Sequence, residues 1–363
     1  MFRHRIGDLE PELPIRCIFL STQLSLTDRN LPEYLRSVGL AEATDDVVVE
    51  PAGDGNINWV RRARLKGGKS YIVKQARPAL EKFPEYEVST DRIVFEARYL
   101  ARVQPLDTED LCPAVHHFDP DQKVLVMEDL GASVRLDDAL EARRPIADEM
   151  EAVARLLGRV HRATADDPDL AAEFANDAMR RLHGDHIFTL PYREEFPAPP
   201  KTAELGERVR KDAEVAEIAA NAYDSYLRPT GPLVHADVQP SNLLLTSTGP
   251  KLLDAEIAHA GDPAFDVGTL VAHLALPAAA QGEPDEADEL LGRVWLAYTE
   301  EHGQRGIASA TDVMRYAGLE LTRRTIGAAR VAFVEQDEAG VRVLETSLAW
   351  IRRPEAAASD LTR

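Results

Sequence analysis

The chain has 363 residues, of which 44% are hydrophobic and 29% are charged, a composition that excludes wholesale disorder and gives room for two lobes or two domains. Lys and Arg total 42 against 62 Asp and Glu, and the resulting net charge of −20 argues against a nucleic-acid or anionic-membrane partner. The two cysteines, Cys17 and Cys112, lack CxxC spacing, which excludes a disulfide framework, disfavours a structural zinc site and indicates a reducing, cytoplasmic compartment.

Residues 1–26 are expected to form a loosely attached N-terminal extension. The apolar stretch Ile15–Leu20 is short, is interrupted by Arg16 and follows acidic residues, so a signal peptide is not expected. The sequence contains no uninterrupted run of 18 apolar residues and therefore predicts no membrane-spanning helix.

The first third of the chain alternates short strands with turns. Two strands are predicted on either side of the turn Gly53-Asp54-Gly55, a third closes at Lys74, and a later hairpin turns at Asp119-Pro120-Asp121. Short strands joined in this way favour an antiparallel sheet. Helices are predicted at Leu31–Val38 and at Asp91–Val103, where the apolar residues fall mostly on one stripe.

Helical patterns dominate after Gly131, beginning with Met150–Arg162. One strand-rich stretch, 233–259, interrupts them. A strand-rich part joined to a helix-rich part implies two lobes with a cleft between them, and the hinge is expected near Glu128–Gly131. The proline-rich segment 196–201 is expected to be a surface loop.

The segment 233–268 holds the densest set of candidate catalytic residues. A short apolar strand delivers Asp237 to a loop, and Asn242 follows five residues later on the same loop. Two further apolar strands form a hairpin that ends at Asp254, which brings Asn242 and Asp254 near each other. Carboxylate and amide oxygens at this spacing suit Mg²⁺, and Asp237 is then placed to orient an attacking hydroxyl.

Taken alone, each of these acidic residues would be an ordinary exposed turn residue. Their order between apolar strands, however, is similar to the protein-kinase sequence of a catalytic Asp, an Asn and a metal-binding Asp. We therefore interpret the set as a site of phosphoryl transfer.

Candidate phosphate-binding residues lie upstream. Lys74 closes an apolar strand, from which a lysine can reach phosphate oxygens as a point charge, and Glu96 on the following helix can pair with it. In the turn that contains Gly55, glycines permit close approach of the backbone to phosphates. The alternatives are a solvated lysine, a solvated helix acid and an ordinary hairpin.

A contact for an adenine base is expected at the lobe junction. Exposed backbone groups of Glu128, Asp129 and Leu130 can meet the edge of the base, and Met127 or Leu130 can cover its face. The alternative is that these residues form an ordinary strand end and bind no base.

These motifs together resemble a known family. The order HxDxxxxN…D followed by GDPAFD is similar to the aminoglycoside phosphotransferase and choline kinase superfamily of protein-kinase-like small-molecule kinases. More specifically, the blocks GDGNINWV, YIVKQARP, STDRIVFEARYL, VMEDL, LLDAEIA and LTRRTIG resemble the 5-methylthioribose kinase family and occur in its order. The DxE form Asp254-Ala255-Glu256 and the twin arginine Arg323-Arg324 are its more specific marks.

The resemblance implies an α+β fold of the bilobal, protein-kinase-like type. Residues 27–130 would be a small N-lobe, an antiparallel β-sheet with one helix, that binds the nucleotide. Residues 131–363 would be a larger, mostly α-helical C-lobe that carries the catalytic and acceptor-binding residues. A homodimer is also implied.

The resemblance further implies a role for each candidate residue. ATP phosphates would meet Asn58 and Lys74, and Glu128–Leu130 would hold the adenine. Asp237 would orient the substrate hydroxyl, while Asp254 and Glu256 would hold Mg²⁺ and phosphates. The twin arginine would reach the transferred phosphoryl group or the sugar, because two guanidinium groups offer multidentate stabilisation of developing charge. Asp266 would brace the catalytic loop.

The chain departs from the family at the acceptor side. Methylthioribose kinases tend to have HGDLHTGS at the catalytic loop, where this chain has HADVQPSN. The expected reaction is ATP-dependent phosphorylation of a small sugar, 5-methylthioribose, at its anomeric hydroxyl. A nucleoside or aminoglycoside antibiotic as acceptor, GTP as donor, a non-catalytic pseudokinase and a helical protein without a nucleotide remain open alternatives.

Overall fold

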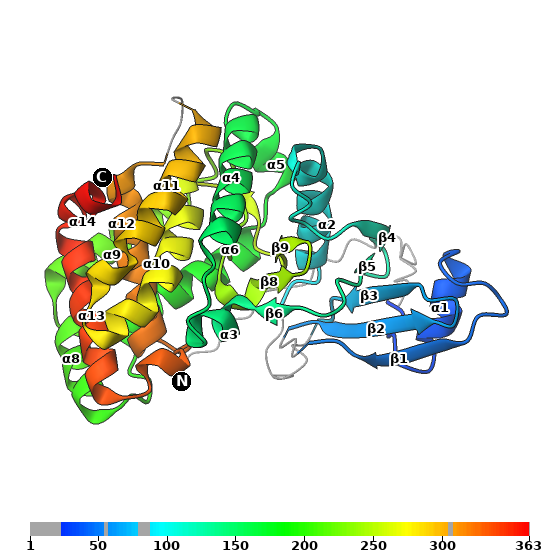
Figure 1. Ribbon diagram of the computed structural model, residues 1–363, viewed down its shortest axis with the longest axis horizontal. Helices are drawn as coiled ribbons and strands as arrows, with labels where there is room; N and C mark the ends of the chain where they lie inside the picture. The colour runs from blue at the N-terminus through cyan, green and yellow to red at the C-terminus, as the bar shows by residue number, and fades with distance from the viewer. Residues whose placement is uncertain (1–22, 54–56, 79–87, 304–307, 363) are drawn as a thin grey trace, which may run out of the picture.

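The computed structural model describes residues 23–53, 57–78, 88–303 and 308–362, and these form two lobes of mixed α and β structure (Figure 1). Of the expected N-terminal extension, residues 1–22 lie outside the described residues. Leu26 at its end is buried, and its backbone N–H donates to Gln75 over 3.0 Å. The last residues of the expected extension therefore belong to the packed small lobe.

The small lobe is built on a five-stranded antiparallel sheet of order β1-β2-β3-β5-β4. The strands are β1 Val47–Pro51, β2 Trp59–Leu65, β3 Ser70–Gln75, β4 Val115–Asp119 and β5 Val124–Glu128. Two helices accompany them, α1 Leu31–Ser37 and α2 Arg92–Val103, and a short 3₁₀ turn, η1 Gln104–Leu106, follows α2. The helix predicted at Leu31–Val38 corresponds to α1. The helix predicted at Asp91–Val103 corresponds to α2, which is the one helix expected in the nucleotide-binding lobe.

Both faces of the sheet are covered, because alternate residues of a strand point to opposite faces. One face packs with α1 through Tyr71, Val73, Val124 and Val126. The opposite face packs with α2 through Leu125 and Met127. Lys74 follows Val73 in β3 and is therefore directed to the face that α2 covers.

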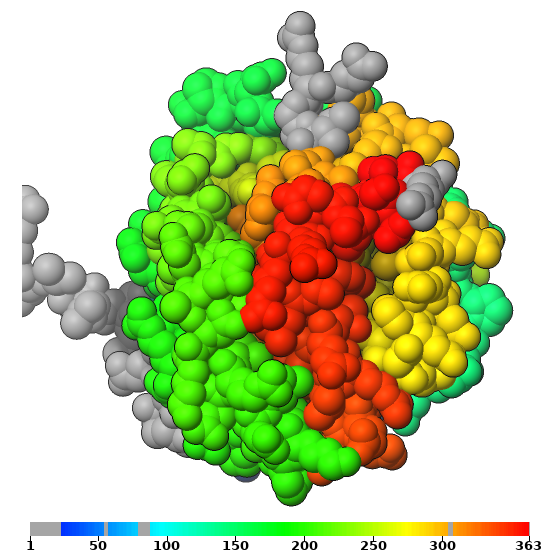
Figure 2. Space-filling model, turned by 90° about the vertical axis from the view of Figure 1, so that its left-hand side faces the viewer, coloured from blue at the N-terminus to red at the C-terminus, as the bar shows by residue number. Residues whose placement is uncertain are grey.

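The large lobe is mostly helical. Its helices are α3 Leu136–Glu141, α4 Ala147–Thr164, α5 Leu170–Glu173, α6 Asp177–Gly184, α7 Leu190–Arg193, α8 Pro200–Arg210, α9 Ala213–Tyr226, α10 Pro263–Gln281, α11 Asp288–His302, α12 Ala310–Ile326, α13 Asp337–Arg352 and α14 Pro354–Leu361. A π-helical turn, η2 Asp185–Thr189, joins α6 to α7, and the 3₁₀ turns are η3 Pro240–Asn242, η4 Pro284–Ala287 and η5 Ala332–Val334. In Figure 2, α13 crosses the surface beside α8 and α9, and α14 packs against α11 and α12.

Short strands interrupt the helices, most of them at the predicted strand-rich stretch 233–259; a further strand at Val134–Arg135 was not predicted. They are β6 Val134–Arg135, β7 Leu233–Val234, β8 Leu243–Thr246, β9 Gly249–Leu252 and β10 His259–Ala260. β8 and β9 form the expected hairpin, and β10 pairs with β7. The ends of these strands hold the catalytic-loop residues against the helical core.

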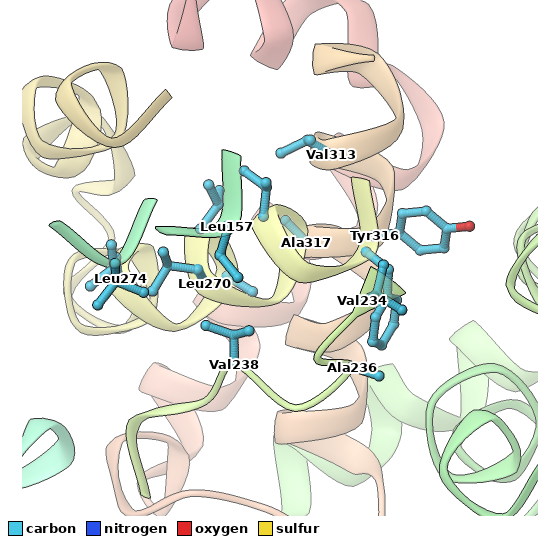
Figure 3. Packing of buried hydrophobic residues seen from close by; sticks show 14 of the residues in the cluster. Leu157, Val234, Ala236, Val238, Leu270, Leu274, Val313, Tyr316 and Ala317 are labelled. Atoms are coloured by element: carbon cyan, nitrogen blue, oxygen red, sulfur yellow. The ribbon is translucent and has the colours of Figure 1, made fainter. Parts of the chain in front are cut away.

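Helix α10 is the centre of that core. It is long and apolar enough to cross a membrane by length and composition, but 89% of its most apolar window is buried inside the fold, as in the core helix of a globular domain. Leu270 and Leu274 of α10 pack with Leu157 of α4 and with Val238 of the loop 235–242 (Figure 3). The loop therefore rests on a packed apolar base.

Gly268 allows α10 and α12 to approach closely. A Cβ at this position would lie 2.8 Å from both the Val313 carbonyl oxygen and the Tyr316 Cβ. We expect Gly268→Ala to lower the free energy of unfolding by about 1–3 kcal/mol, because backbone must move to admit the methyl group. Urea unfolding measures the change.

The matched control is Gly292→Ala in α11. Its Cβ would meet only the Leu361 carbonyl oxygen, at 3.9 Å. Alanine is favoured over glycine in a helix interior by up to about 1 kcal/mol, so this variant should be as stable as the parent or more so. Equal stability of the two alanine variants would contradict the close packing of α10 and α12.

Candidate active site

Lys74 lies between the two lobes, with its side chain only 7% exposed. Its Nζ atom is 2.7 Å from Glu96 Oε2, which is the expected ion pair with α2, and it also pairs with Asp254 of the large lobe. Burial by itself would lower the pKa of Lys74, but the surrounding carboxylates outweigh burial and raise the pKa above its usual range. The lysine is therefore charged and is shared by both lobes.

An acidic cluster surrounds this lysine. Glu96, Asp254 and Glu256 each offer a carboxylate oxygen within 4.8 Å of the others. Burial, and then the neighbouring charge of Asp254, raise the pKa of Glu256 to about 7. The raised pKa shows that the charged form of Glu256 is disfavoured by its neighbours, and a bound cation would stabilise that form. Carboxylate oxygens are also the ligands that Mg²⁺ prefers.

Asn58 links the small lobe to this cluster. Its Nδ2 donates to Glu256 Oε2 over 2.8 Å, and its Oδ1 accepts from the Nε of Arg92 over 3.0 Å. Arg92 is fully buried on α2 and also donates to the backbone carbonyls of Ser89 and Ile57. A buried arginine thus fixes the end of the glycine turn. Gly55 itself lies outside the described residues.

The catalytic loop is held from below by Asp266 of α10. Its carboxylate accepts from the backbone N–H groups of His235 and Ala236 over 2.8 and 2.7 Å, and His161 lies 3.2 Å away. Ala236 has φ +66°, a left-handed conformation that costs an alanine about 1–2 kcal/mol. The two charge-assisted hydrogen bonds hold the strained residue in place, and Asp266 braces the loop.

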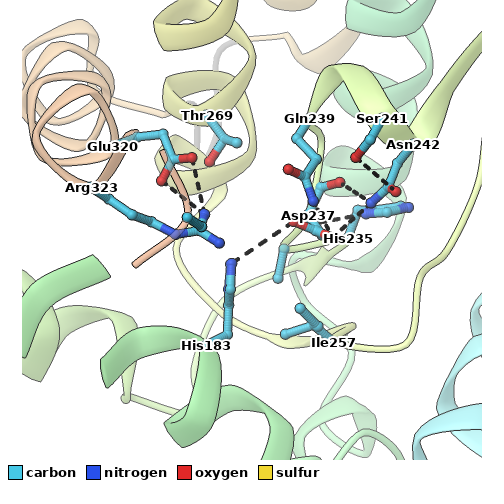
Figure 4. Close-up of polar contacts among 12 residues, drawn as sticks. His183, His235, Asp237, Gln239, Ser241, Asn242, Ile257, Thr269, Glu320 and Arg323 are labelled. Carbon is cyan, nitrogen blue, oxygen red and sulfur yellow. Dashed lines mark hydrogen bonds and ion pairs between the residues drawn. The ribbon is translucent and has the colours of Figure 1, made fainter. Parts of the chain in front are cut away.

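Asp237 is presented by this braced loop. Its Oδ2 accepts from Asn242 Nδ2 over 2.6 Å and from Gln239 Nε2 over 2.9 Å (Figure 4). Burial raises the pKa of Asp237 to about 6, although the Arg323 charge opposes the rise. Oδ2 is therefore occupied by protein donors, and Oδ1 is the oxygen left to face a substrate.

Asn242 also lies next to Asp254, as the predicted hairpin requires. Its backbone carbonyl accepts from the Leu253 N–H over 2.9 Å. Because its amide nitrogen donates to Asp237, its amide oxygen is the atom that can bind a cation.

The twin arginine is buried on α12 and is held by Glu320. Arg323 donates to both carboxylate oxygens over 3.0 and 3.1 Å, and Arg324 donates from Nε over 2.7 Å. Arg324 also donates to Gln239, which itself donates to Asp237. Arg323 Nε has no hydrogen-bond partner among the described residues, so Arg323 retains a free donor.

At the lobe junction, the side chains expected to meet adenine are bound to protein. Glu128 accepts from the Ala114 N–H over 3.2 Å, and Asp129 accepts from Arg62 Nε over 2.8 Å. Burial opposes ionisation of Asp129, but hydrogen bonds from Ser70 and Arg62 hold its pKa below the usual value. Glu128, Asp129 and the half-buried Leu130 would therefore contact an adenine base through their backbone groups.

Four residues around the site were not among the sequence candidates: Arg92, His183, Gln239 and Glu320. The spacing of Glu320, three and four residues before the arginines, is a local signal that could have identified it. Gln239 lies two residues after Asp237 in the loop. Arg92 and His183 carry no local signal, since contacts between distant segments bring them to the site.

The arrangement can now be compared with known proteins. A family model described as the phosphotransferase enzyme family matches residues 48–306, which is well over half of the chain. The chain belongs to this family. The phosphotransferase is 29% identical over 378 residues to the methylthioribose kinase of Escherichia coli O45:K1 (strain S88 / ExPEC), covering 86% of the chain and 88% of that relative. It is 26% identical over 345 residues to the methylthioribose kinase of Bacillus cereus (strain G9842), covering 86% and 87%.

Solved structures share the fold of the phosphotransferase. Choline kinase from Cryptosporidium parvum Iowa II matches with a TM-score of 0.53 at 12% identity, covering 92% of this chain and 98% of that one. Choline kinase LicA from Streptococcus pneumoniae matches with a TM-score of 0.50 at 18% identity, covering 89% and 98%. The expected family resemblance and bilobal protein-kinase-like fold are confirmed. The protein is an enzyme, a kinase-type phosphotransferase for small molecules.

Proposed function

We propose that the enzyme transfers the γ-phosphoryl group of ATP to a sugar hydroxyl, with 5-methylthioribose as acceptor and 5-methylthioribose 1-phosphate as product. The observation that carries the ATP-dependent reaction is the meeting of Lys74 with Asp254 across the two lobes, close to Asp237. The choice of sugar is supported by relatives named methylthioribose kinase that align with 86% of the chain.

Nucleotide binding would belong to the lobe of residues 27–130, and the residues for metal and acceptor to the lobe of residues 131–363. In residues 27–130, Lys74 and Asn58 would bind the ATP phosphates, with Glu96 holding the lysine, and the backbone of 128–130 would bind adenine. In residues 131–363, the carboxylates of Asp254 and Glu256 and the amide oxygen of Asn242 fit Mg²⁺ by donor type. Bound Mg²⁺ neutralises phosphate charge.

Asp237 would align the acceptor hydroxyl through Oδ1 and accept its proton as the phosphoryl group departs from ADP. Its orientation is fixed by Asn242 and Gln239, which hold Oδ2. Arg323, charged and adjacent, would stabilise negative charge on the transferred group. His235 is not needed as a base, because its Nδ1 accepts from the Asp237 backbone N–H over 3.2 Å.

An acceptor panel tests the proposal. Purified enzyme with MgATP is offered 5-methylthioribose, a nucleoside and an aminoglycoside, and ADP formation and the phosphorylated product are measured. We expect turnover with 5-methylthioribose and product phosphorylated at the anomeric oxygen. GTP in place of ATP tests the donor. Turnover confined to a nucleoside or an aminoglycoside would overturn the choice of sugar, and absence of ADP with all acceptors would overturn the proposed reaction.

The proposal includes a cytoplasmic location and a homodimeric state. A cytoplasmic location agrees with the use of ATP, and Cys112 is a buried free thiol. Sedimentation equilibrium tests the homodimer that the family resemblance implies.

A further inference from the structure

His183 is a buried histidine that faces Asp237 from the opposite side of the site. It lies in the last turn of α6, and its side chain is 7% exposed. Its Nε2 is 3.8 Å from Asp237 Oδ1, which is too long for a direct hydrogen bond, and this nitrogen has no hydrogen-bond partner among the described residues (Figure 4). A buried polar atom without a partner requires an explanation.

The imidazole ring is held in a fixed orientation. Its Nδ1 lies 3.3 Å from the Tyr226 hydroxyl, and the ring makes edge contacts with Tyr226 and Phe265 at centroid distances of 6.4 and 5.9 Å. The next residue, Gly184, packs so closely that a Cβ would lie 2.5 Å from the Tyr223 ring. His183 therefore cannot turn toward another partner without disturbing the aromatic core.

The neighbours also determine which ring nitrogen carries hydrogen. Burial, assisted by the Arg323 charge, holds the pKa of His183 well below its usual value, so the ring is neutral. Burial keeps the pKa of Tyr226 well above its usual value, so its hydroxyl is protonated and can donate to Nδ1. The tautomer with hydrogen on Nε2 then points a donor toward the Asp237 carboxylate, which electrostatics favours.

A pattern of donors and acceptors surrounds the space beside Asp237 Oδ1. Within the described part of the chain, His183 Nε2 and Arg323 Nε are both buried donors without hydrogen-bond partners, and no protein donor occupies Oδ1 of Asp237. Figure 4 shows Arg323 directed toward His183. A hydroxyl can donate to Oδ1 while the neighbouring hydroxyl accepts from the two donors. An ammonium group has no lone pair for either donor.

We propose that His183 is an acceptor-binding residue whose Nε2–H donates to the hydroxyl next to the one phosphorylated, so that the site selects neutral acceptors with two adjacent hydroxyl groups. This inference rests on the proposed function and names the substrate feature that the site reads. It disfavours amine-bearing acceptors, because an ammonium group would leave both buried donors unpaired.

The test combines two variants with two acceptors. His183→Phe keeps an aromatic ring but removes the donor, and His183→Gln can retain a donor near the Nε2 position. The acceptors are 5-methylthioribose and its 2-deoxy analogue, which lacks the adjacent hydroxyl. For each combination of enzyme variant and acceptor, kcat/KM for the acceptor and KM for ATP are measured. The thermal midpoint with MgATP is measured for each variant.

We expect His183→Phe to lower kcat/KM for 5-methylthioribose by about 10- to 100-fold, and His183→Gln to restore part of it. The 2-deoxy analogue should be used equally by wild type and His183→Phe, because the hydroxyl that His183 would bind is missing. KM for ATP should not change. The thermal midpoint of His183→Phe should fall modestly, because the buried Tyr226 hydroxyl loses its acceptor Nδ1. His116→Phe, at an exposed histidine of β4, is the matched control and should behave as wild type.

Equal losses with both acceptors, or unchanged use of 5-methylthioribose by His183→Phe, would overturn the role of His183. A large fall in thermal midpoint together with a rise in KM for ATP would assign the histidine a structural role instead. Failure of the proposed function is distinguishable, because wild type would then give no ADP with 5-methylthioribose before any variant is compared.

Discussion

Asp237→Asn is expected to lower kcat by about 10²–10⁴-fold, the usual contribution of a positioned carboxylate base, while MgATP still binds. The amide keeps the shape of the side chain but cannot take the acceptor proton. Lys74, Asp254 and Glu256, which would bind the nucleotide and metal, belong to other segments and keep their contacts. Turnover of 5-methylthioribose measures the first effect, and the thermal shift on addition of MgATP measures the second.

The matched control is Asp177→Asn, which removes an exposed acid on α6 whose side chain is 63% accessible. It should turn over substrate as the parent does. Turnover by Asp237→Asn within about twofold of wild type would contradict its role as the base. Loss of the MgATP shift in that variant would instead indicate that Asp237 helps to hold the nucleotide.

Glu320→Leu is expected to have the largest effect on stability. The variant leaves the guanidinium groups of Arg323 and Arg324 buried without their carboxylate, and removing one partner of a buried ion pair typically costs about 3–5 kcal/mol. Urea unfolding followed by circular dichroism gives the change in free energy of unfolding. Acceptor turnover should fall as well, because Glu320 holds Arg323 beside Asp237.

The loss of stability caused by Glu320→Leu is expected to depend on pH. Burial opposes ionisation of Glu320, but the charges of Arg323 and Arg324 outweigh it and hold the pKa of Glu320 well below its usual value. Its contribution to stability is therefore fully present above the pKa of the unfolded chain and is lost as pH falls toward the folded-state pKa. The stability difference between wild type and Glu320→Leu should be largest near neutral pH and smaller in acid.

Glu207→Gln is the matched control for the charge change. Its ion pair with Lys211 is exposed, so the variant should unfold at the same urea concentration as wild type. Equal unfolding midpoints for Glu320→Leu and wild type would contradict the view that Glu320 neutralises the buried arginines.

Much of the site follows from local rules. Alternation along β3 directs Lys74 to the face opposite Val73, and helical spacing presents Glu96 to that face. The pairing of β8 with β9 brings Asn242 beside Leu253 and hence Asp254. Strand and helix periodicity act over a few residues, so the sequence is sufficient to predict these neighbours.

Other features depend on how distant elements pack. The expectation that Arg323 and Arg324 both reach the ligand did not include Glu320 and Gln239, which hold the pair from within the protein. Arg92 has the appearance of a helix-surface residue in the sequence, yet it is fully buried against Asn58.

The sequence by itself determined the two-lobed α+β organisation and the order of the residues proposed to bind phosphate, metal and acceptor, because periodicity and turn chemistry are encoded locally. Tertiary structure alone decided which side chains from other helices meet Asp237. His183 from α6 and Arg323 from α12 meet there because those helices pack around α10 and the aromatic cluster of Tyr226 and Phe265. Contacts of this kind depend on the shapes of whole elements, and no local pattern in the chain records them.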